Sequence, residues 1–106
     1  MKIGCDILET KRIKLDMVGH ILSSQELEDF VKLKEEEKRQ FLASRFSIKE
    51  ALFKVGLKKP MTLITIIKEN DGSLSVLNEN YSVSLSHDGG FTMAVAIRNS
   101  ENPCKS

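Results

Sequence analysis

The chain places several charged residues where their side chains could do chemistry. Asp6 lies in an otherwise apolar stretch, residues 2–8, whose composition is typical of a β-strand. A carboxylate in such a strand caps the following turn, accepts backbone N–H bonds or holds a cation, and the sequence leaves these roles open. His87 follows Ser84 and Ser86 at the mouth of a predicted hairpin. A histidine there is either a plain turn residue or a polar group of a binding site.

Four more charged residues lie in the central part of the chain. At about 100° per residue along a helix, Arg45 and Lys49 fall near the middle of a wide apolar face. The apolar members of that face are Phe41, Leu42, Phe46, Ile48, Leu52, Phe53 and Val55. A cation in the middle of this face must reach water, form a structural ion pair or meet an anion. Glu50 and Lys54 lie at the edge of the face, where they form either an i,i+4 surface pair or part of a site.

These residues are carried by two kinds of element, of which the helices come first. Residues 10–22 show apolar side chains at roughly helical spacing after the first strand. Ser23 and Glu26 form a Ser-x-x-Glu signal that predicts the start of a helix reaching about residue 34. A second, longer helix is predicted over residues 35–55, and Gly56 follows its end.

Beyond this helix the spacing of apolar residues changes from helical to extended. Strands are predicted at residues 61–68, 74–77, 81–86 and 91–97, separated by turns at 70–73, 78–80 and 88–90. The order of one strand, helices and then several antiparallel strands predicts an α+β fold, an antiparallel sheet packed around a long central helix.

Length and composition predict one compact domain. The chain has 106 residues, of which 41% are hydrophobic and 29% charged, so residues 1–99 are expected to form a single domain and residues 100–106 a loose polar tail. Neither a membrane-spanning stretch nor a secretion signal is visible, which favours the cytoplasm. Cys5 and Cys104 lack the spacing of a zinc site, although a disulfide between them stays open.

Charge is balanced over the whole chain but not along it. The formal net charge is +1, yet residues 45–59 hold five basic residues and only one acid. Nucleic-acid binding normally needs a broad basic surface and aromatic residues for stacking, and this chain has one Tyr and no Trp. A local basic stretch fits one anionic small ligand better, or a solvated basic helix face. We therefore expect neither nucleic acid nor a membrane as a partner.

Three motifs, taken together in their order, point to a known family. They are Gly4-x-Asp6-x-x-Glu9-x-x-Arg12-Ile13, then Arg45-Phe46-x-x-Lys49-Glu50-Ala51-x-x-Lys54, then Ser84-x-Ser86-His87. The chain resembles the 4′-phosphopantetheinyl transferases from Met1 to about Ile97, and within them the small holo-acyl-carrier-protein synthase type. The second motif is the most specific of the three.

The resemblance implies a reaction and a set of site residues. The 4′-phosphopantetheine arm of coenzyme A (CoA) would move to a serine of an apo acyl carrier protein, releasing adenosine 3′,5′-bisphosphate. Asp6 and Glu50 would hold Mg²⁺, which prefers carboxylate and phosphate oxygens, and Lys54 would reach the same phosphates. Ser84, Ser86 and His87 would help to bind CoA, and Arg45 would contact a nucleotide phosphate. Asp6, Glu50 and a metal-bound water are all candidate bases for the serine proton.

The resemblance also implies partners. Acyl carrier proteins are acidic, and Lys11, Arg12 and Lys14 offer a basic docking surface or a merely solvated cluster. Family members of this size assemble as trimers with each active site between neighbours, so a homotrimer is expected. A non-catalytic CoA- or nucleotide-binding module of the same fold is the alternative. The chain lacks the family's Gly-Thr-Gly-like loop after Lys54, where Lys58 and Lys59 could substitute.

Overall fold

A computed structural model of the protein describes residues 1–100. These residues form one sheet with helices on one side. The strands are β1 (Ile3–Glu9), β2 (Ile66–Lys68), β3 (Leu74–Val76), β4 (Tyr81–Asp88) and β5 (Phe91–Arg98). The helices are α1 (Val18–Ile21), α2 (Ser24–Phe30) and α3 (Glu35–Lys54), with 3₁₀ turns at Thr10–Arg12, Leu15–Met17 and Met61–Leu63. No helix within the described residues is long and apolar enough to cross a membrane.

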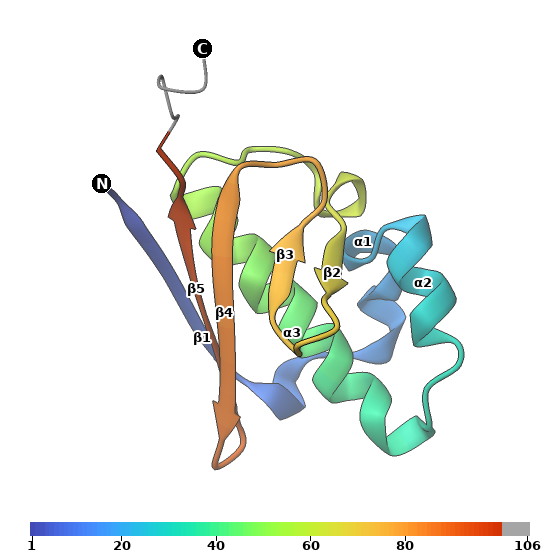
Figure 1. Cartoon of the computed structure of the whole chain (residues 1–106). Coiled ribbons are helices and arrows are strands. Elements are labelled where there is room, and N and C mark those ends of the chain that lie inside the picture. The colour runs from blue at the N-terminus through green and yellow to red at the C-terminus, as the bar shows by residue number, and fades with distance from the viewer. Residues whose placement is uncertain (101–106) are drawn as a thin grey trace.

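The sheet is antiparallel throughout, in the order β1-β5-β4-β3-β2. The long strands β1, β5 and β4 pair along their whole lengths, whereas β3 joins β4 through the single pair Ser75↔Ser82. Figure 1 shows α3 crossing behind the sheet, with α1 and α2 beside the end that carries β2. The predicted α+β architecture, a sheet packed on a long helix, is confirmed.

A glycine allows α3 to lie unusually close to β1. A Cβ atom on Gly4 would lie 2.2 Å from the carbonyl oxygen of Ala51 and 3.1 Å from Cγ1 of Val55. Since only a hydrogen occupies that space, the strand and the helix backbone come into direct contact. The core between sheet and helix is built from small and branched residues, namely Ile48, Ala51, Leu52, Val55, Leu57, Ile64, Ile66, Val76, Ala94 and Ala96.

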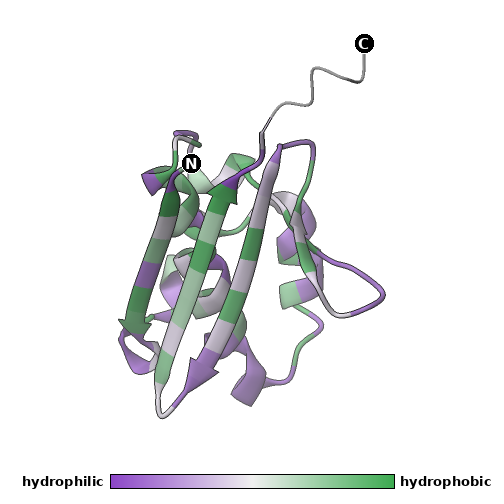
Figure 2. Ribbon diagram, turned by 60° about the vertical axis from the view of Figure 1, so that its left-hand side comes forward, coloured by the Kyte–Doolittle hydropathy of each residue, from purple (hydrophilic) through white to green (hydrophobic). Residues whose placement is uncertain are grey.

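The opposite face of the sheet is open, and over β1 and β5 it is apolar. Alternation along β1 and β5 turns Ile3, Ile7, Phe91 and Met93 away from α3, and these side chains are 66%, 62%, 48% and 40% exposed. Figure 2 shows that β1, β5 and β4 form this face and that no helix of the described chain covers it. Exposed apolar area of this kind marks an interaction surface.

Three predicted elements differ from the observed ones. Residues 10–22 form two 3₁₀ turns and the short α1, because Ile13 is buried in extended backbone between the turns. α2 ends at Phe30, after which the chain turns through bonds from Lys32 to Asp29 and from Leu33 to Phe30. Only Ile66–Lys68 of the predicted strand 61–68 is a strand, since the preceding 3₁₀ turn packs against α1 instead of β3.

The long helix and the turns agree with the sequence pattern, with one exception on the apolar face. α3 spans Glu35–Lys54, and the Gly89-Gly90 turn joins β4 to β5 as predicted. Phe53 was expected to be buried, but it is 50% exposed and the Nζ of Lys58 lies 4.8 Å from its ring centre. It lies in the last turn of α3, outside the group of residues that packs on the sheet.

Candidate functional site

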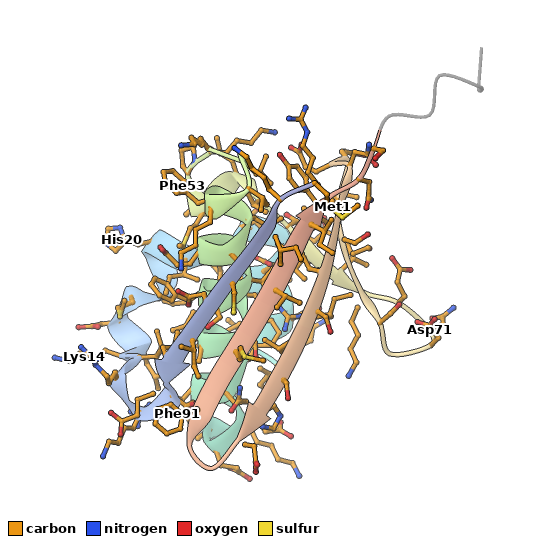
Figure 3. All side chains as sticks on the ribbon, turned by 90° about the vertical axis from the view of Figure 1, so that its left-hand side faces the viewer. Met1, Lys14, His20, Phe53, Asp71 and Phe91 are labelled. Atoms are coloured by element: carbon orange, nitrogen blue, oxygen red, sulfur yellow. The ribbon has the colours of Figure 1, made fainter. Side chains whose placement is uncertain are left out.

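The predicted acidic residues come from β1 and α3, which run antiparallel to each other. Gly4 meets Ala51 and Val55, whereas Leu8 packs against the cluster that contains Leu42. Figure 3 agrees with this antiparallel arrangement, because the start of β1 near Met1 and the end of α3 near Phe53 lie at the same end of the molecule. Asp6 lies between Gly4 and Leu8 on the helix-facing side of β1, so it lies level with the middle of α3, where Ser47 and Glu50 are located.

Asp6 and Lys54 lie close together. Oδ1 of Asp6 is 3.7 Å from Nζ of Lys54, and that ammonium donates a hydrogen bond of 2.7 Å to the carbonyl oxygen of Cys5. Oδ2 of Asp6 is buried and has no hydrogen-bond partner among the described residues. A buried carboxylate oxygen without a partner is costly in a protein alone, and it is the kind of oxygen that a divalent cation would take.

Glu50 supplies the second carboxylate from α3. It is half-buried, one helical turn before Lys54, and forms no ion pair with any residue in 1–100. No group of three or more His, Cys, Asp or Glu residues gathers anywhere in this part of the chain. Asp6 and Glu50 are carboxylates of the kind that Mg²⁺ takes, since this ion commonly uses one or two carboxylates and completes its shell with phosphate oxygens and water. Oγ of Ser47 is also buried without a partner.

Arg45 lies on a different side of α3, in a second candidate cluster. It is only 9% exposed, its guanidinium carbon lies 4.1 Å from the ring centre of Phe41, and its Nε has no hydrogen-bond partner among the described residues. Burial lowers the pKa of Arg45, while the negative charges of Glu26 and Asp29 oppose that shift. A buried guanidinium with free donor capacity is suited to bind an anion such as phosphate.

A cavity of about 350 Å³ opens beside Arg45, between β4 and the β2–β3 hairpin. Lys68, Ser73, Ser84 and His87 are among the residues that line it. Asp6, Glu50 and Lys54 do not line this cavity. The chain therefore presents two separate clusters, one with the carboxylates and Lys54, the other with Arg45 and His87.

Strand alternation separates the three residues of the last motif. His87 pairs with the buried Thr92 and therefore lies on the helix side of β4. Ser84 and Ser86 pair with Val95 and Met93, so their side chains belong to the open face of the sheet. The three side chains of the motif therefore do not share one face of β4: Ser84 is among the residues that line the cavity beside His87, and Ser86 is not.

A second cavity, of about 510 Å³, lies where α3 ends. Its charged lining residues, Lys2, Lys54, Lys58 and Arg98, are all basic. Of the two lysines considered as substitutes for the missing glycine-rich loop, Lys58 lines this cavity, whereas Lys59 forms an ion pair with Glu79. The cavity therefore extends the positive charge of Lys54 towards the first and last strands.

The predicted docking residues lie at the opposite end of β1. Lys11, Arg12 and Lys14 are exposed and follow the strand directly, in and just after the first 3₁₀ turn. Nζ of Lys11 lies 3.5 Å from a carboxylate oxygen of Glu9. This cluster is accessible to an acidic partner protein.

Lys49, the motif residue without a predicted role, is fully buried. Its ammonium donates hydrogen bonds to Oε1 of Glu26, at 2.5 Å, and to the carbonyl oxygens of Ile21 and Met61, at 2.8 and 3.0 Å. Sequence reasoning read Glu26 only as a helix cap and missed this pair, since the two residues lie 23 positions apart. The signal that pointed to it was a lysine in the middle of an apolar face, which needs a buried acid.

Comparisons with known proteins agree with the motifs. Residues 2–96 match the family described as the 4′-phosphopantetheinyl transferase superfamily. The holo-[acyl-carrier-protein] synthase of Mycoplasma capricolum is 33% identical over 106 aligned residues, which cover 94% of this chain and 96% of that protein. The synthase of Bacillus subtilis is 32% identical, with 90% and 92% covered.

Solved structures show the same architecture. A holo-(acyl-carrier-protein) synthase from Bacillus anthracis, in complex with CoA (3′,5′-ADP), superposes with a TM-score of 0.79 at 28% identity and covers 89% of this chain and 91% of that one. The Helicobacter pylori synthase in complex with coenzyme A gives 0.74 at 26% identity, with 92% and 100% covered. The chain therefore belongs to the 4′-phosphopantetheinyl transferase superfamily.

Proposed function

We propose that this protein is a holo-acyl-carrier-protein synthase, which transfers 4′-phosphopantetheine from CoA to a serine of an apo acyl carrier protein. The observation that carries the proposal is the buried, unpartnered Oδ2 of Asp6 beside Lys54. These two residues and Glu50 occupy the matching motif positions on β1 and α3. Relatives with about 30% identity over nearly the whole chain carry this name.

In this proposal, Asp6 and Glu50 hold Mg²⁺, and the ion would offset negative charge on the CoA pyrophosphate as the transfer proceeds. The carrier serine oxygen attacks the phosphorus that bears the pantetheine arm, and the bond from that phosphorus to the bridging oxygen breaks. The bridging oxygen leaves with adenosine 3′,5′-bisphosphate, and Lys54 offsets its developing charge. A carboxylate, Asp6 or Glu50, or a water takes the serine proton.

Donor binding is divided between the two clusters. Arg45 and His87 line the cavity of about 350 Å³, with Ser84 at its rim and Ser86 beyond it. Lys54 lies in the other cluster, where Lys58 and Arg98 extend the basic surface. We propose that the donor spans both clusters, with its phosphates on Lys54 and Arg45.

This division supports a homotrimer with active sites between subunits. A ligand as large as CoA needs two walls, and each subunit offers one wall with the carboxylates and another with Arg45. The open apolar face of β1 and β5, with Ile3, Ile7, Phe91 and Met93, is available for contact between subunits. In the proposed assembly, this contact brings the carboxylates of one subunit to Arg45 and His87 of the next.

The acidic carrier protein is proposed to dock on Lys11, Arg12 and Lys14. These side chains are exposed, and they belong to the segment that directly follows β1, the strand that carries Asp6. Complementary charge mainly raises the rate of encounter and selects the partner. The carrier serine would then approach the carboxylates from this end of the strand.

A mass spectrum of apo carrier protein after incubation with the enzyme, CoA and Mg²⁺ tests the proposal. The carrier should gain the mass of one phosphopantetheine group, and a carrier with its acceptor serine replaced by alanine should gain nothing. The Asp6→Asn variant provides the matched enzyme control. If calorimetry shows that CoA binds while the carrier mass never changes, the protein is a non-catalytic CoA-binding module instead.

A further inference from the structure

The ammonium of Lys49 has no capacity left for a substrate. An ammonium carries three protons, and here all three are donated, to Glu26, Ile21 and Met61. The side chain is also fully buried, with none of its surface exposed. Burial lowers the pKa of Lys49, and the charge and hydrogen bond of Glu26 oppose that shift. In the sequence motif, Lys49 stands between Arg45 and Lys54, which are proposed to bind phosphate. Its own side chain is nevertheless turned into the core, away from both clusters.

Glu26 uses both carboxylate oxygens to connect separate parts of the chain. Oε1 accepts hydrogen bonds from Lys49 and from the backbone N–H of Ser23, at 2.5 and 2.9 Å. Oε2 accepts a hydrogen bond of 2.9 Å from the backbone N–H of Ile66. The same carboxylate thus caps α2, pairs with α3 and binds the first residue of β2.

The β2–β3 hairpin has a short connection to β4, so these bonds add to the core packing of Ile66 and Val76 that holds it in place. Its only ladder pair with β4 is Ser75↔Ser82. Lys68 and Ser73 of this hairpin form one wall of the cavity that contains Arg45 and His87. The Glu26–Ile66 bond holds the start of the hairpin against α2, and the Lys49–Met61 bond holds the turn before the hairpin against α3.

We infer that Lys49 and Glu26 are positioning residues, which hold the β2–β3 hairpin at the distance that lets the Arg45 cavity bind the CoA nucleotide. The inference rests on the proposed function for its readout in catalysis. It assigns Lys49 no contact with CoA, although Lys49 lies between Arg45 and Glu50 in the most specific motif. Loss of the pair should loosen donor binding and leave the carboxylate cluster unchanged.

The test compares Lys49→Met, Glu26→Gln and the double variant, with Lys32→Met as the same change at an exposed lysine. Lys49→Met leaves a buried carboxylate unpaired and should lower the melting temperature by about 12 °C or more. In the double variant, the amide group that replaces the Glu26 carboxylate can still accept from Ile66 or Ser23 and can donate to Ile21 or Met61. The double variant should therefore recover much of the lost stability.

Kinetics at a temperature where every variant is folded distinguish positioning from direct contact. Lys49→Met should raise the KM for CoA about tenfold or more and change kcat less, and the double variant should bring that KM back towards the wild-type value. If Lys49 acts on the donor phosphates, the double variant will remain as impaired as Lys49→Met, and the inference is overturned. Lys32→Met should match the wild type.

Two measurements do not depend on turnover. The amide of Ile66 should exchange its hydrogen faster in Lys49→Met and in Glu26→Leu, which leaves the Ile66 N–H without its acceptor, and adenosine 3′,5′-bisphosphate should bind more weakly to Lys49→Met in calorimetry. Unchanged exchange at Ile66 in Glu26→Leu would refute the positioning role even if Lys49→Met failed to fold, since Glu26→Leu removes both the ion pair and the acceptor of the Ile66 N–H. A wild-type enzyme that never transfers phosphopantetheine would instead refute the proposed function, and the exchange result would still stand.

Discussion

Replacing Gly4 by alanine should separate the strand that carries Asp6 from the helix that carries Lys54. The added Cβ would lie 2.2 Å from the carbonyl oxygen of Ala51, whereas real Cβ contacts essentially never fall below 3.0 Å, so the two elements must part by about 0.8 Å. The obstructing atom belongs to the helix backbone and cannot rotate away. Asp6, two residues further along β1, would move together with the strand.

The size of the effect follows from this overlap. Overpacking of a tight contact costs about 1–3 kcal/mol and occasionally more, which for a domain of this size corresponds to a melting temperature lower by about 5–20 °C. A displacement of a catalytic group by nearly 1 Å lowers the reaction rate by up to about 100-fold. We therefore expect Gly4→Ala to lose activity more severely than its stability alone would explain.

The assay is carrier mass gain over time at a temperature where the variant is folded, together with a melting curve. Gly19→Ala is the matched control, because a Cβ at Gly19 meets nothing within 4 Å and alanine favours the helix. This control should melt at or above the wild-type temperature. If Gly4→Ala melts within about 2 °C of the wild type and transfers at the same rate, the close approach does not position the site.

Further predictions concern individual site residues and the assembly. Asp6→Asn and Glu50→Gln should each abolish transfer while the melting temperature stays nearly unchanged; near-normal mass gain of the carrier in either variant would contradict their role in holding the metal ion. Lys54→Ala should raise the KM for CoA and lower kcat, measured by steady-state release of adenosine 3′,5′-bisphosphate, and an unchanged kcat would remove it from the transfer step. Arg12→Glu should raise the KM for carrier protein more than that for CoA, and equal effects on both would place docking elsewhere. Met93→Glu on the open sheet face should shift the sedimentation of the protein towards the monomer, and an unaltered trimer would exclude this face from the contact.

Local signals in the sequence predicted much of the fold. The Ser23–Glu26 capping box forms as the Ser-x-x-Glu pattern indicated, and α3 spans nearly the predicted range because its signals lie within the helix itself. The motif residues Asp6 and Lys54, from the first and the second motif, lie close together in the fold.

Features decided by distant contacts were not predicted. Residues 61–65 have strand-forming side chains, yet their backbone turns to meet α1 and Lys49. The partner of Lys49 is 23 positions away, and no short pattern marks it. The separation of Ser84 and Ser86 from His87 could have been predicted, since a strand continued beyond residue 86 places alternate residues on opposite faces.

The threefold use of Glu26 has a consequence for how this chain can vary through evolution. Its carboxylate serves a helix cap, an ion pair and a strand end at once, so no neighbouring position can take over all three duties. A substitution at only one of Glu26 and Lys49 produces a strongly destabilised protein, because it leaves the other charge buried and unpaired. Across a deep alignment of relatives, these two columns should therefore be retained together or replaced together, and substitutions at one should predict the residue found at the other.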